Sequence, residues 1–341
     1  MTAIFVTGAT GVVGQALIAR LPWAQLYCLV RRTPVSGRNI QPIAGDISLP
    51  RLGLTRSEYV ELAGRINLVV HAAAITDFEQ PQDTINQTNV EGTQNIIELA
   101  CTASVPLYYI GTAFSETRTS IGGFDANSYE ISKRAAEQVV RSSGVPHVIL
   151  RPSVVVGDSR TGAISRFQGF HLVMGLLLRG LLPMAPAAPS SYIDFVPQDL
   201  VARIIAGLIE RGDTHGEHWL TLGDSAITLQ QLVEWCLEHA TRLTGRTVAR
   251  PRAFSPDAFE RLIRPVFLPA LPPHLRQLFD RALHMARYFN IDQAFPSSVP
   301  RLCAELNIEK LPQPQPTLAR NIEYWARRND FGGEVAQALP A

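Results

Sequence analysis

The stretch Thr7-Gly8-Ala9-Thr10-Gly11-Val12-Val13-Gly14 decides the fold of this chain. It follows residues 3–6, whose β-branched and aromatic side chains predict a buried strand, and it precedes residues 16–19, which predict a helix. In such a turn Gly8 permits the tight bend, Gly11 lets backbone approach a pyrophosphate, and Gly14 lets the helix pack closely on the strand. Free N–H groups at the helix start attract phosphate. We therefore expect a dinucleotide-binding turn, with a purely structural turn as the alternative.

The composition is that of an ordinary globular protein. Of 341 residues, 46% are hydrophobic and 18% are charged, and the formal net charge of +1 predicts no binding of nucleic acid. The longest apolar stretch, residues 172–182, contains Arg179 and is shorter than the roughly 20 residues of a membrane span, so no transmembrane segment is expected. The N-terminus lacks the pattern of a signal peptide, which predicts a cytoplasmic protein.

Neither the cysteines nor the histidines have the spacing of a metal site, and no metal is expected. The four cysteines lie far apart and are predicted to be reduced, buried thiols: Cys28, Cys101, Cys236 and Cys303. We expect His71 to be packed at a strand end, and His215 and His218 to be structural or solvated residues of a loop.

Strands and helices alternate along the first half of the chain. The predicted strands are residues 3–6, 26–30, 43–47, 66–70, 107–110 and 148–157, and the predicted helices between them include 86–100 and 129–141. This alternation predicts an α/β fold with a Rossmann-type doubly wound parallel sheet and a site at the carboxyl ends of its strands. We expect an NADP-binding domain over residues 1–160 and a smaller, mainly helical substrate-binding lobe over residues 161–341, with segments around 191–225 returning to the sheet.

Basic residues follow the predicted second strand. Arg31 and Arg32 stand where an acidic residue would favour NAD and where arginine accommodates a 2′-phosphate, so NADPH is expected rather than NADH. Two solvated surface arginines are the alternative, and Arg38 is a weaker third candidate. Asp46, after the third strand, either accepts a hydrogen bond from the adenine amino group or caps the following turn.

Tyr129 and Lys133 are spaced four residues apart on a predicted helix. This spacing puts both side chains on one helical face, so that the lysine, helped by an oxidised nicotinamide, would lower the pKa of the phenol. With Thr112 after the fifth strand, the pattern predicts a tyrosine general acid. A surface tyrosine beside a solvated lysine is the alternative.

Several motifs resemble those of the extended short-chain dehydrogenase/reductases, and within them the thioester-reductase and fatty acyl-CoA reductase branch with a male-sterility-type NAD-binding domain. The motifs that carry the resemblance cover residues 1 to about 240: Gly8 to Gly14, residues 45–48 with 52–54, 71–74 and 89–93, Tyr129 to Lys133, residues 151–162 and 193–197. One departure is Gly111 before Thr112, where the family usually has serine.

The resemblance implies a set of site residues. Thr112, Tyr129 and Lys133 would form the catalytic triad, and Asn89 would support the proton relay. The implied cofactor-binding residues are Gly8, Thr10, Gly11, Val13, Gly14, Arg31, Arg32, Asp46, Ile47, Ala72, Ala73, Tyr129, Lys133, Pro152, Ser153 and Val154. Family members often dimerise through the tyrosine helix, which implies a homodimer, although residues 135–136 and 139–140 would look similar if packed in a monomer.

The expected function is NADPH-dependent reduction of an acyl thioester, carried by an acyl or peptidyl carrier protein or by CoA, to an aldehyde and then, with a second hydride, to an alcohol. One alternative is an extended-family dehydrogenase or epimerase acting on a nucleotide sugar or a sterol-like alcohol, which shares Tyr129 and Lys133 but is disfavoured by the run 151–162. A redox-sensing regulator on the same fold is a third alternative, which the intact triad disfavours.

The distal half offers two features of the substrate lobe. An apolar helix is predicted around residues 167–177, either as core or as the lining of an acyl groove. Four arginines are candidates to meet an acidic carrier, although exposed arginines are usually only solvated: Arg250, Arg252, Arg261 and Arg264.

Overall fold

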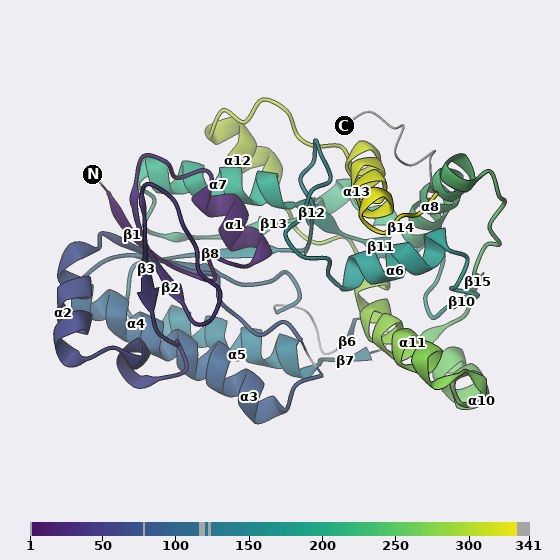
Figure 1. Ribbon diagram of the computed structural model, residues 1–341, viewed down its shortest axis with the longest axis horizontal. Coiled ribbons are helices and arrows are strands. Elements are labelled where there is room, and N and C mark those ends of the chain that lie inside the picture. The colour runs from purple at the N-terminus through teal and green to yellow at the C-terminus, as the bar shows by residue number, and fades with distance from the viewer. Residues whose placement is uncertain (1, 78, 116–119, 122–123, 333–341) are drawn as a thin grey trace.

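The computed structural model describes residues 2–77, 79–115, 120–121 and 124–332 (Figure 1). The last part of the predicted substrate lobe, residues 333–341, lies outside the described residues. The chain forms a sheet covered by helices on both faces, with a second, mainly helical lobe beside it (Figure 1).

Seven parallel strands form the central sheet in the order β3-β2-β1-β4-β5-β8-β13. They are β1 (Ala3–Thr7), β2 (Gln25–Val30), β3 (Ile40–Ala44), β4 (Leu68–His71), β5 (Leu107–Ile110), β8 (His147–Pro152) and β13 (Gly216–Leu220). The chain builds outward from β1 to β3, then crosses back to β4 on the other side of β1. This reversal opens a crevice at the carboxyl ends of β1 and β4 and confirms the predicted doubly wound fold.

Helices cover both faces of the sheet. On one face lie α1 (Val12–Ile18), α7 (Gln198–Arg211) and α12 (Val299–Glu305), and on the other lie α2 (Arg56–Arg65), α4 (Gly92–Ala103) and α5 (Ser128–Ser142) (Figure 1). Because β1 and β4 are buried on both faces, their sequences are almost continuously apolar. Both α2 and α5 begin with a capping box, formed by Thr55 with Glu58 and by Asn127 with Glu130.

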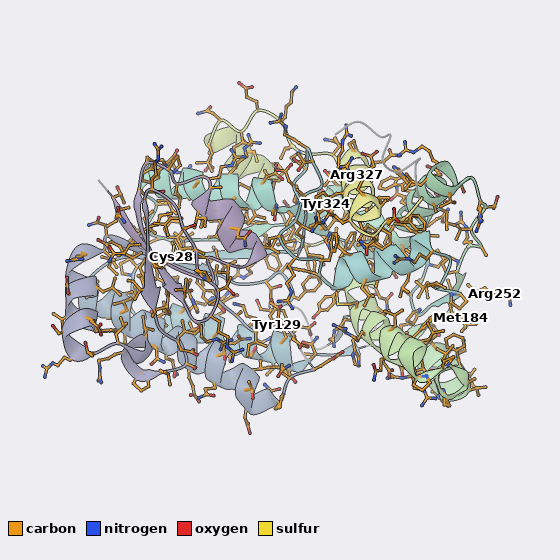
Figure 2. All side chains as sticks on the ribbon, viewed as in Figure 1. Cys28, Tyr129, Met184, Arg252, Tyr324 and Arg327 are labelled. Carbon is orange, nitrogen blue, oxygen red and sulfur yellow. The ribbon has the colours of Figure 1, made fainter. Side chains whose placement is uncertain are left out.

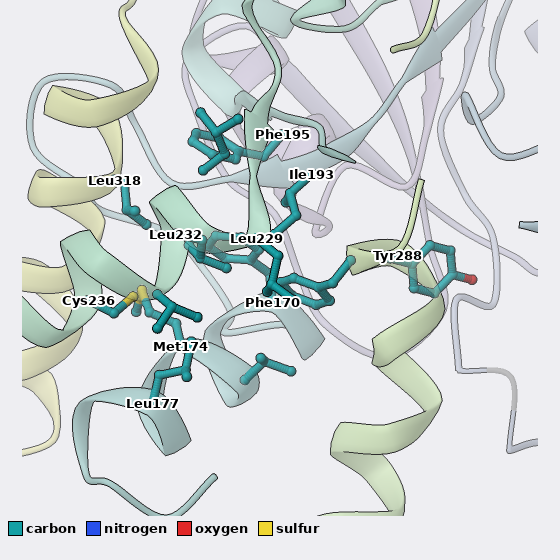
Figure 3. Packing of buried hydrophobic residues seen from close by; sticks show 14 of the residues in the cluster. Phe170, Met174, Leu177, Ile193, Phe195, Leu229, Leu232, Cys236, Tyr288 and Leu318 are labelled. Carbon is teal, nitrogen blue, oxygen red and sulfur yellow. The ribbon is translucent and has the colours of Figure 1, made fainter. Parts of the chain in front are cut away.

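The second lobe has its own apolar core. Its helices are α6 (Gly169–Leu178), α8 (Leu229–Thr244), α9 (Pro256–Ala258), α10 (Arg264–Ala270), α11 (Pro273–Ala286) and α13 (Pro314–Arg328). Phe170, Met174 and Leu177 of α6 pack there against Leu232 and Cys236 of α8 (Figure 3).

Short elements complete the chain. Two-stranded pairs form between β9 (Val154–Val156) and β12 (Phe195–Pro197), β10 (Met184–Ala185) and β15 (Arg252–Ala253), β11 (Tyr192–Ile193) and β14 (Ile227–Thr228), and β6 (Ser120–Ile121) and β7 (Phe124–Asp125). The helix α3 (Gln82–Asn86) runs into a π-helical turn, Gln87–Glu91, directly before α4. Within the described residues, no helix combines the length and apolar character needed to span a bilayer.

Several predicted boundaries are wrong. The third strand is Ile40–Ala44 rather than 43–47, because its register with β2 ends at Ala44. The predicted strand 148–157 is broken at Ser153, whose N–H donates to Leu220, and continues as β9 outside the sheet. In the segment 191–225, Tyr192–Ile193 and Phe195–Pro197 pair outside the sheet, and it is β13 that joins it.

Two side chains differ from expectation. His218 lies in the strand β13 rather than in a loop, and it is buried at the sheet edge. Cys101 is exposed on α4, whereas the other three cysteines are buried, and all four are free thiols.

Candidate active site

A cleft of about 1040 Å³ lies at the carboxyl edge of the sheet, between the sheet and the second lobe. Its lining includes the residues expected to bind the cofactor: Gly8, Thr10, Gly11, Val13, Gly14, Arg31, Arg32, Asp46, Ile47, Ala72, Ala73, Tyr129, Lys133, Pro152, Ser153 and Val154. Thr112 lines it too, whereas Asn89 does not. Figure 2 shows Tyr129 between the sheet and the second lobe.

The glycine turn has no room for side chains. Gly8 has a φ of +72°, and a Cβ on it would lie 2.5 Å from the carbonyl carbon of Ala72. A Cβ on Gly14 would lie 2.0 Å from the carbonyl oxygen of Gly8. Gly11, at the N-cap of α1, offers no side chain to the first free N–H groups of the helix. This cradle of bare backbone at a helix N-terminus fits the pyrophosphate of a dinucleotide.

The residues at the other end of the cofactor cradle are charged. Arg31 is exposed, with Nη1 3.5 Å from Oδ2 of Asp46. Oδ1 of Asp46 accepts hydrogen bonds from the backbone N–H of Ser48 at 3.0 Å and from its hydroxyl at 2.8 Å. Burial raises the pKa of Asp46, but these hydrogen bonds and Arg31 outweigh it and lower the pKa overall. Asp46 therefore caps the turn, which was one of its two predicted roles.

Thr112, Tyr129 and Lys133 converge at the centre of the cleft. Nζ of the buried Lys133 donates to the carbonyl oxygen of Ile110 at 2.8 Å and lies 4.3 Å from the centroid of the Tyr109 ring. The hydroxyl of Thr112 hydrogen-bonds to Tyr129, which is half-buried. The three side chains come from the end of β5 and from one face of α5, as their positions in the sequence predict.

The pKa values of this group differ from expectation. Burial raises the pKa of Tyr129 to about 12, although the Thr112 hydrogen bond opposes the rise. Lys133 is not among the groups that lower it, so the expected lowering of the phenol pKa is not provided by the protein alone. Burial lowers the pKa of Lys133 itself to about 7, against the opposing charge of Glu137. Tyr129 is therefore held protonated at neutral pH, as a general acid requires.

Asn89 and His71 support the backbone around the cleft. Asn89 is buried in the π-helical turn, where it accepts from the N–H of Ile75 at 2.8 Å and donates to the hydroxyl of Ser132 at 3.0 Å. That hydroxyl donates to the carbonyl oxygen of Tyr129 at 2.7 Å. His71 is packed as expected, and burial lowers its pKa to about 3, which keeps the ring neutral. The relay role of Asn89 stays a prediction.

A buried ionic network behind the cleft was not anticipated. Glu137, one turn after Lys133 on α5, accepts from Nε of Arg151 at 2.9 Å, from Nη2 of Arg141 at 2.8 Å and from the hydroxyl of Ser115 at 3.0 Å. A Cβ on Gly111 would lie 3.1 Å from the Glu137 carboxylate, which accounts for glycine at this position. The four-residue spacing from Lys133 was the available signal in the sequence.

The second lobe supplies the opposite wall of the cleft. Leu172 and Leu176 of α6 line it, while Phe170, Met174 and Leu177 are buried in the core. Both predicted roles of this helix therefore hold, each for one face. Along α11 and the turn after it, a stripe at helical spacing also lines the cleft: Leu278, Arg281, Met285 and Tyr288. Sequence analysis assigned none of these four a role.

Comparison with known proteins identifies the family. The profile described as male sterility protein, an NAD-binding family, matches residues 35–205, just over half of the chain. The chain belongs to the male sterility family. The predicted family is thus confirmed, and with it an NAD(P)-binding reductase domain of the extended short-chain dehydrogenase/reductase type.

Relatives of this male sterility family protein include much longer chains. It is 27% identical to a linear gramicidin synthase of Brevibacillus parabrevis over 60% of its own length, which is 5% of that protein. It is 29% identical to the aldehyde reductase lnaA of Aspergillus flavus over 59% of its own length, which is 24% of that protein. The chain therefore spans only a small part of these relatives.

Solved structures share the fold of this male sterility family protein. The terminal R domain from the myxalamid PKS-NRPS pathway aligns with a TM-score of 0.76 at 23% identity, over 96% of this chain and 91% of that one. The reductase domain of a nonribosomal peptide synthetase from Mycobacterium tuberculosis aligns with a TM-score of 0.70 at 21% identity, over 97% and 92%. At these identities the likeness concerns the fold, and it agrees with the predicted fold class.

Proposed function

We propose that the protein is an NADPH-dependent reductase of acyl thioesters. The observation that carries the proposal is the convergence of Thr112, Tyr129 and Lys133 on a cleft that also holds the glycine cradle. The fold is shared with reductase domains of nonribosomal peptide synthetases, and one such solved structure joins a thiolation domain to a reductase domain. Thiolation domains carry their substrates as thioesters, which supports this substrate class.

The residues suit reduction of a thioester carbonyl. When bound, NADPH supplies the hydride that reduces the carbonyl carbon. Thr112 and Tyr129 would hydrogen-bond the developing oxyanion, and Tyr129, whose raised pKa keeps it protonated, would give the oxygen its proton. The hemithioacetal would then break its C–S bond, returning the proton as it releases a thiol and an aldehyde. A second hydride transfer to the aldehyde would give an alcohol.

Two arginines support NADPH over NADH. Arg31 and Arg32 line the cleft at the carboxyl end of β2, where the adenosine ribose lies in doubly wound folds. Both are exposed, so their guanidinium groups are free to move toward a 2′-phosphate. The nearby Asp46 is turned toward Ser48 and Arg31, which leaves it less suited to accept from a ribose hydroxyl.

Charge in the second lobe supports a carrier-bound substrate. Residues 242–287 contain nine arginines and only three carboxylates, within a chain of net charge +1. Arg250 and Arg264 are paired with Glu234 and Glu260, whereas Arg252 is exposed. This excess of positive charge suits an acidic carrier protein, and a CoA ester is the alternative donor.

A homodimer through α5 remains a prediction. Ala136 and Val140 pack into the core beneath the sheet, so they follow the monomer alternative. Ile131, which is 47% exposed on the same helix, supports an interface.

A nucleotide-sugar enzyme is the second candidate. The Bordetella bronchiseptica enzyme WbmG, solved with NAD and UDP, aligns with a TM-score of 0.65 at 19% identity. This score is lower than that of the R domains, which favours thioester reduction.

Substrate panels separate the candidates. NADPH consumption would be measured with acyl-CoA esters, acyl thioesters on carrier proteins, and nucleotide sugars or sterols, with products identified by mass spectrometry. Aldehyde or alcohol from thioesters alone supports the proposal. Tight NADPH binding with turnover only of sugars or sterols would replace it with the second candidate.

A further inference from the structure

The segment after α11 joins the substrate wall to the helix that carries Tyr129. The cleft-facing stripe of α11 ends at Tyr288, within the 3-10 turn Arg287–Phe289. Arg287 and Tyr288 are both buried, and both contact the beginning of α5, more than 150 residues earlier in the chain. Figure 3 shows Tyr288 at the margin of the apolar cluster, with its hydroxyl directed away from the cluster.

These contacts involve both residues of the α5 capping box. Nη2 of Arg287 donates to Oε2 of Glu130 at 2.9 Å, and the exposed fractions of the two side chains are 10% and 2%. Nδ2 of Asn127 donates to the hydroxyl of Tyr288 at 2.9 Å, and that hydroxyl also hydrogen-bonds to Glu130. Within the box, Glu130 N–H donates to Asn127 at 2.9 Å. Each capping residue therefore has a second partner from the substrate lobe.

Tyr129 lies between the two capping residues, in the first turn of α5. The ring of Tyr288 also packs edge-on against Phe114, with centroids 4.7 Å apart. Phe114 is close to Thr112, whose hydroxyl accepts from the Phe114 N–H at 3.4 Å. Tyr288 thus contacts both segments that present the Thr112 and Tyr129 hydroxyls. The first turn of an isolated helix frays readily, so these partners restrict where the Tyr129 hydroxyl lies.

We propose that Arg287 and Tyr288 are positioning residues for Tyr129, holding the first turn of α5 from the substrate lobe. This inference rests on the proposed function for its catalytic consequence. Because Tyr288 ends the stripe that lines the substrate wall, a substrate packed against α11 would also stabilise the placement of the general acid.

Tyr288→Phe is the main test. It keeps the ring against Phe114 and removes the hydroxyl, so kcat for thioester reduction is expected to fall about tenfold, while KM stays within about twofold, since the energy of one hydrogen-bond network is lost from the transition state. Tyr108→Phe is the matched control, because it removes another buried tyrosine hydroxyl, which donates to the Asp213 carbonyl at 2.6 Å away from the cleft. Its kcat should equal that of the wild type.

Amide hydrogen exchange of the cofactor-free protein gives a readout that does not depend on turnover. The peptide covering residues 127–134 should exchange faster in Tyr288→Phe than in the wild type or in Tyr108→Phe. Arg287→Gln, whose side chain is outside the cleft lining, should also lower kcat without raising KM, and Arg287→Lys should recover part of the loss.

Unchanged kcat and exchange in Tyr288→Phe would overturn the inference, and so would a change in KM alone, which would make Tyr288 a substrate contact. A wild-type protein that reduces no thioester would refute the proposed function, and the exchange comparison would still decide whether Tyr288 holds α5.

Discussion

Replacing Glu137 by glutamine removes one negative charge from the buried network behind the cleft. Glu137 and its partner Arg151 are only 1% and 2% exposed. The carboxylate also accepts from Arg141 and Ser115, and the Ser115 hydroxyl additionally contacts the Thr112 carbonyl oxygen at 2.8 Å. Glutamine keeps the size of the side chain but leaves a buried guanidinium with less compensation.

Breaking a buried ion pair by removing one partner costs about 3–5 kcal/mol. With an unfolding entropy of roughly 2.1 cal/mol/K per residue, a chain of 341 residues that unfolds as one unit should lose about 4–7 °C in Tm. The matched control is Glu217→Gln. Glu217 pairs with the same Arg141 and Arg151, but its side chain is 39% exposed, so water replaces the lost contacts and the cost is about 0–1 kcal/mol.

The assay is thermal unfolding of the wild type and both variants, followed by circular dichroism in one buffer. Glu137→Gln should unfold several degrees below Glu217→Gln. Equal shifts in the two variants would refute the reasoning, because burial would then not decide what the pairs contribute.

Three further predictions concern the cofactor and pH. Gly14→Ala should abolish NADPH binding in calorimetric titration, because its methyl would meet the Gly8 carbonyl oxygen at 2.0 Å, whereas Gly64→Ala, with open space around it, should bind normally. Arg31→Asp should raise the KM for NADPH at least about tenfold and leave that for NADH nearly unchanged, since only NADPH has the 2′-phosphate; equal effects would remove Arg31 from that role. Burial lowers the pKa of Lys133 from 10.5 to about 7, so between these values the unfolded chain binds more protons and stability rises with pH. Lys133→Met should flatten this rise in Tm measured against pH, and an unchanged slope would contradict it.

The central part of the sheet could be predicted because it is buried on both faces. Strands such as β1 and β4 are continuous apolar runs, and the glycine turn and the Tyr129–Lys133 spacing are local patterns that specify where they lie on the fold. The two edge strands were less visible. β3 is largely exposed and contains Pro42, which an edge strand tolerates, and β13 mixes polar residues with Trp219.

The rest of the site depends on contacts between distant segments. Glu137 meets Arg151 across two elements, and Tyr288 meets Asn127 161 residues away in sequence, so no local periodicity reports either pairing. The pKa of Tyr129 could not be read from its spacing to Lys133, because burial outweighs the charges around it.

Transfer of deuterium from the cofactor tests the central claim most directly. The protein would be incubated with an acyl thioester and NADPH deuterated at the transferable C4 position, and the product would be analysed by mass spectrometry beside Tyr129→Phe. The account predicts an aldehyde or alcohol that carries deuterium on the former thioester carbon, formed by the wild type and strongly reduced in Tyr129→Phe. Product without deuterium, or equal formation by Tyr129→Phe, would contradict hydride transfer with Tyr129 as the general acid.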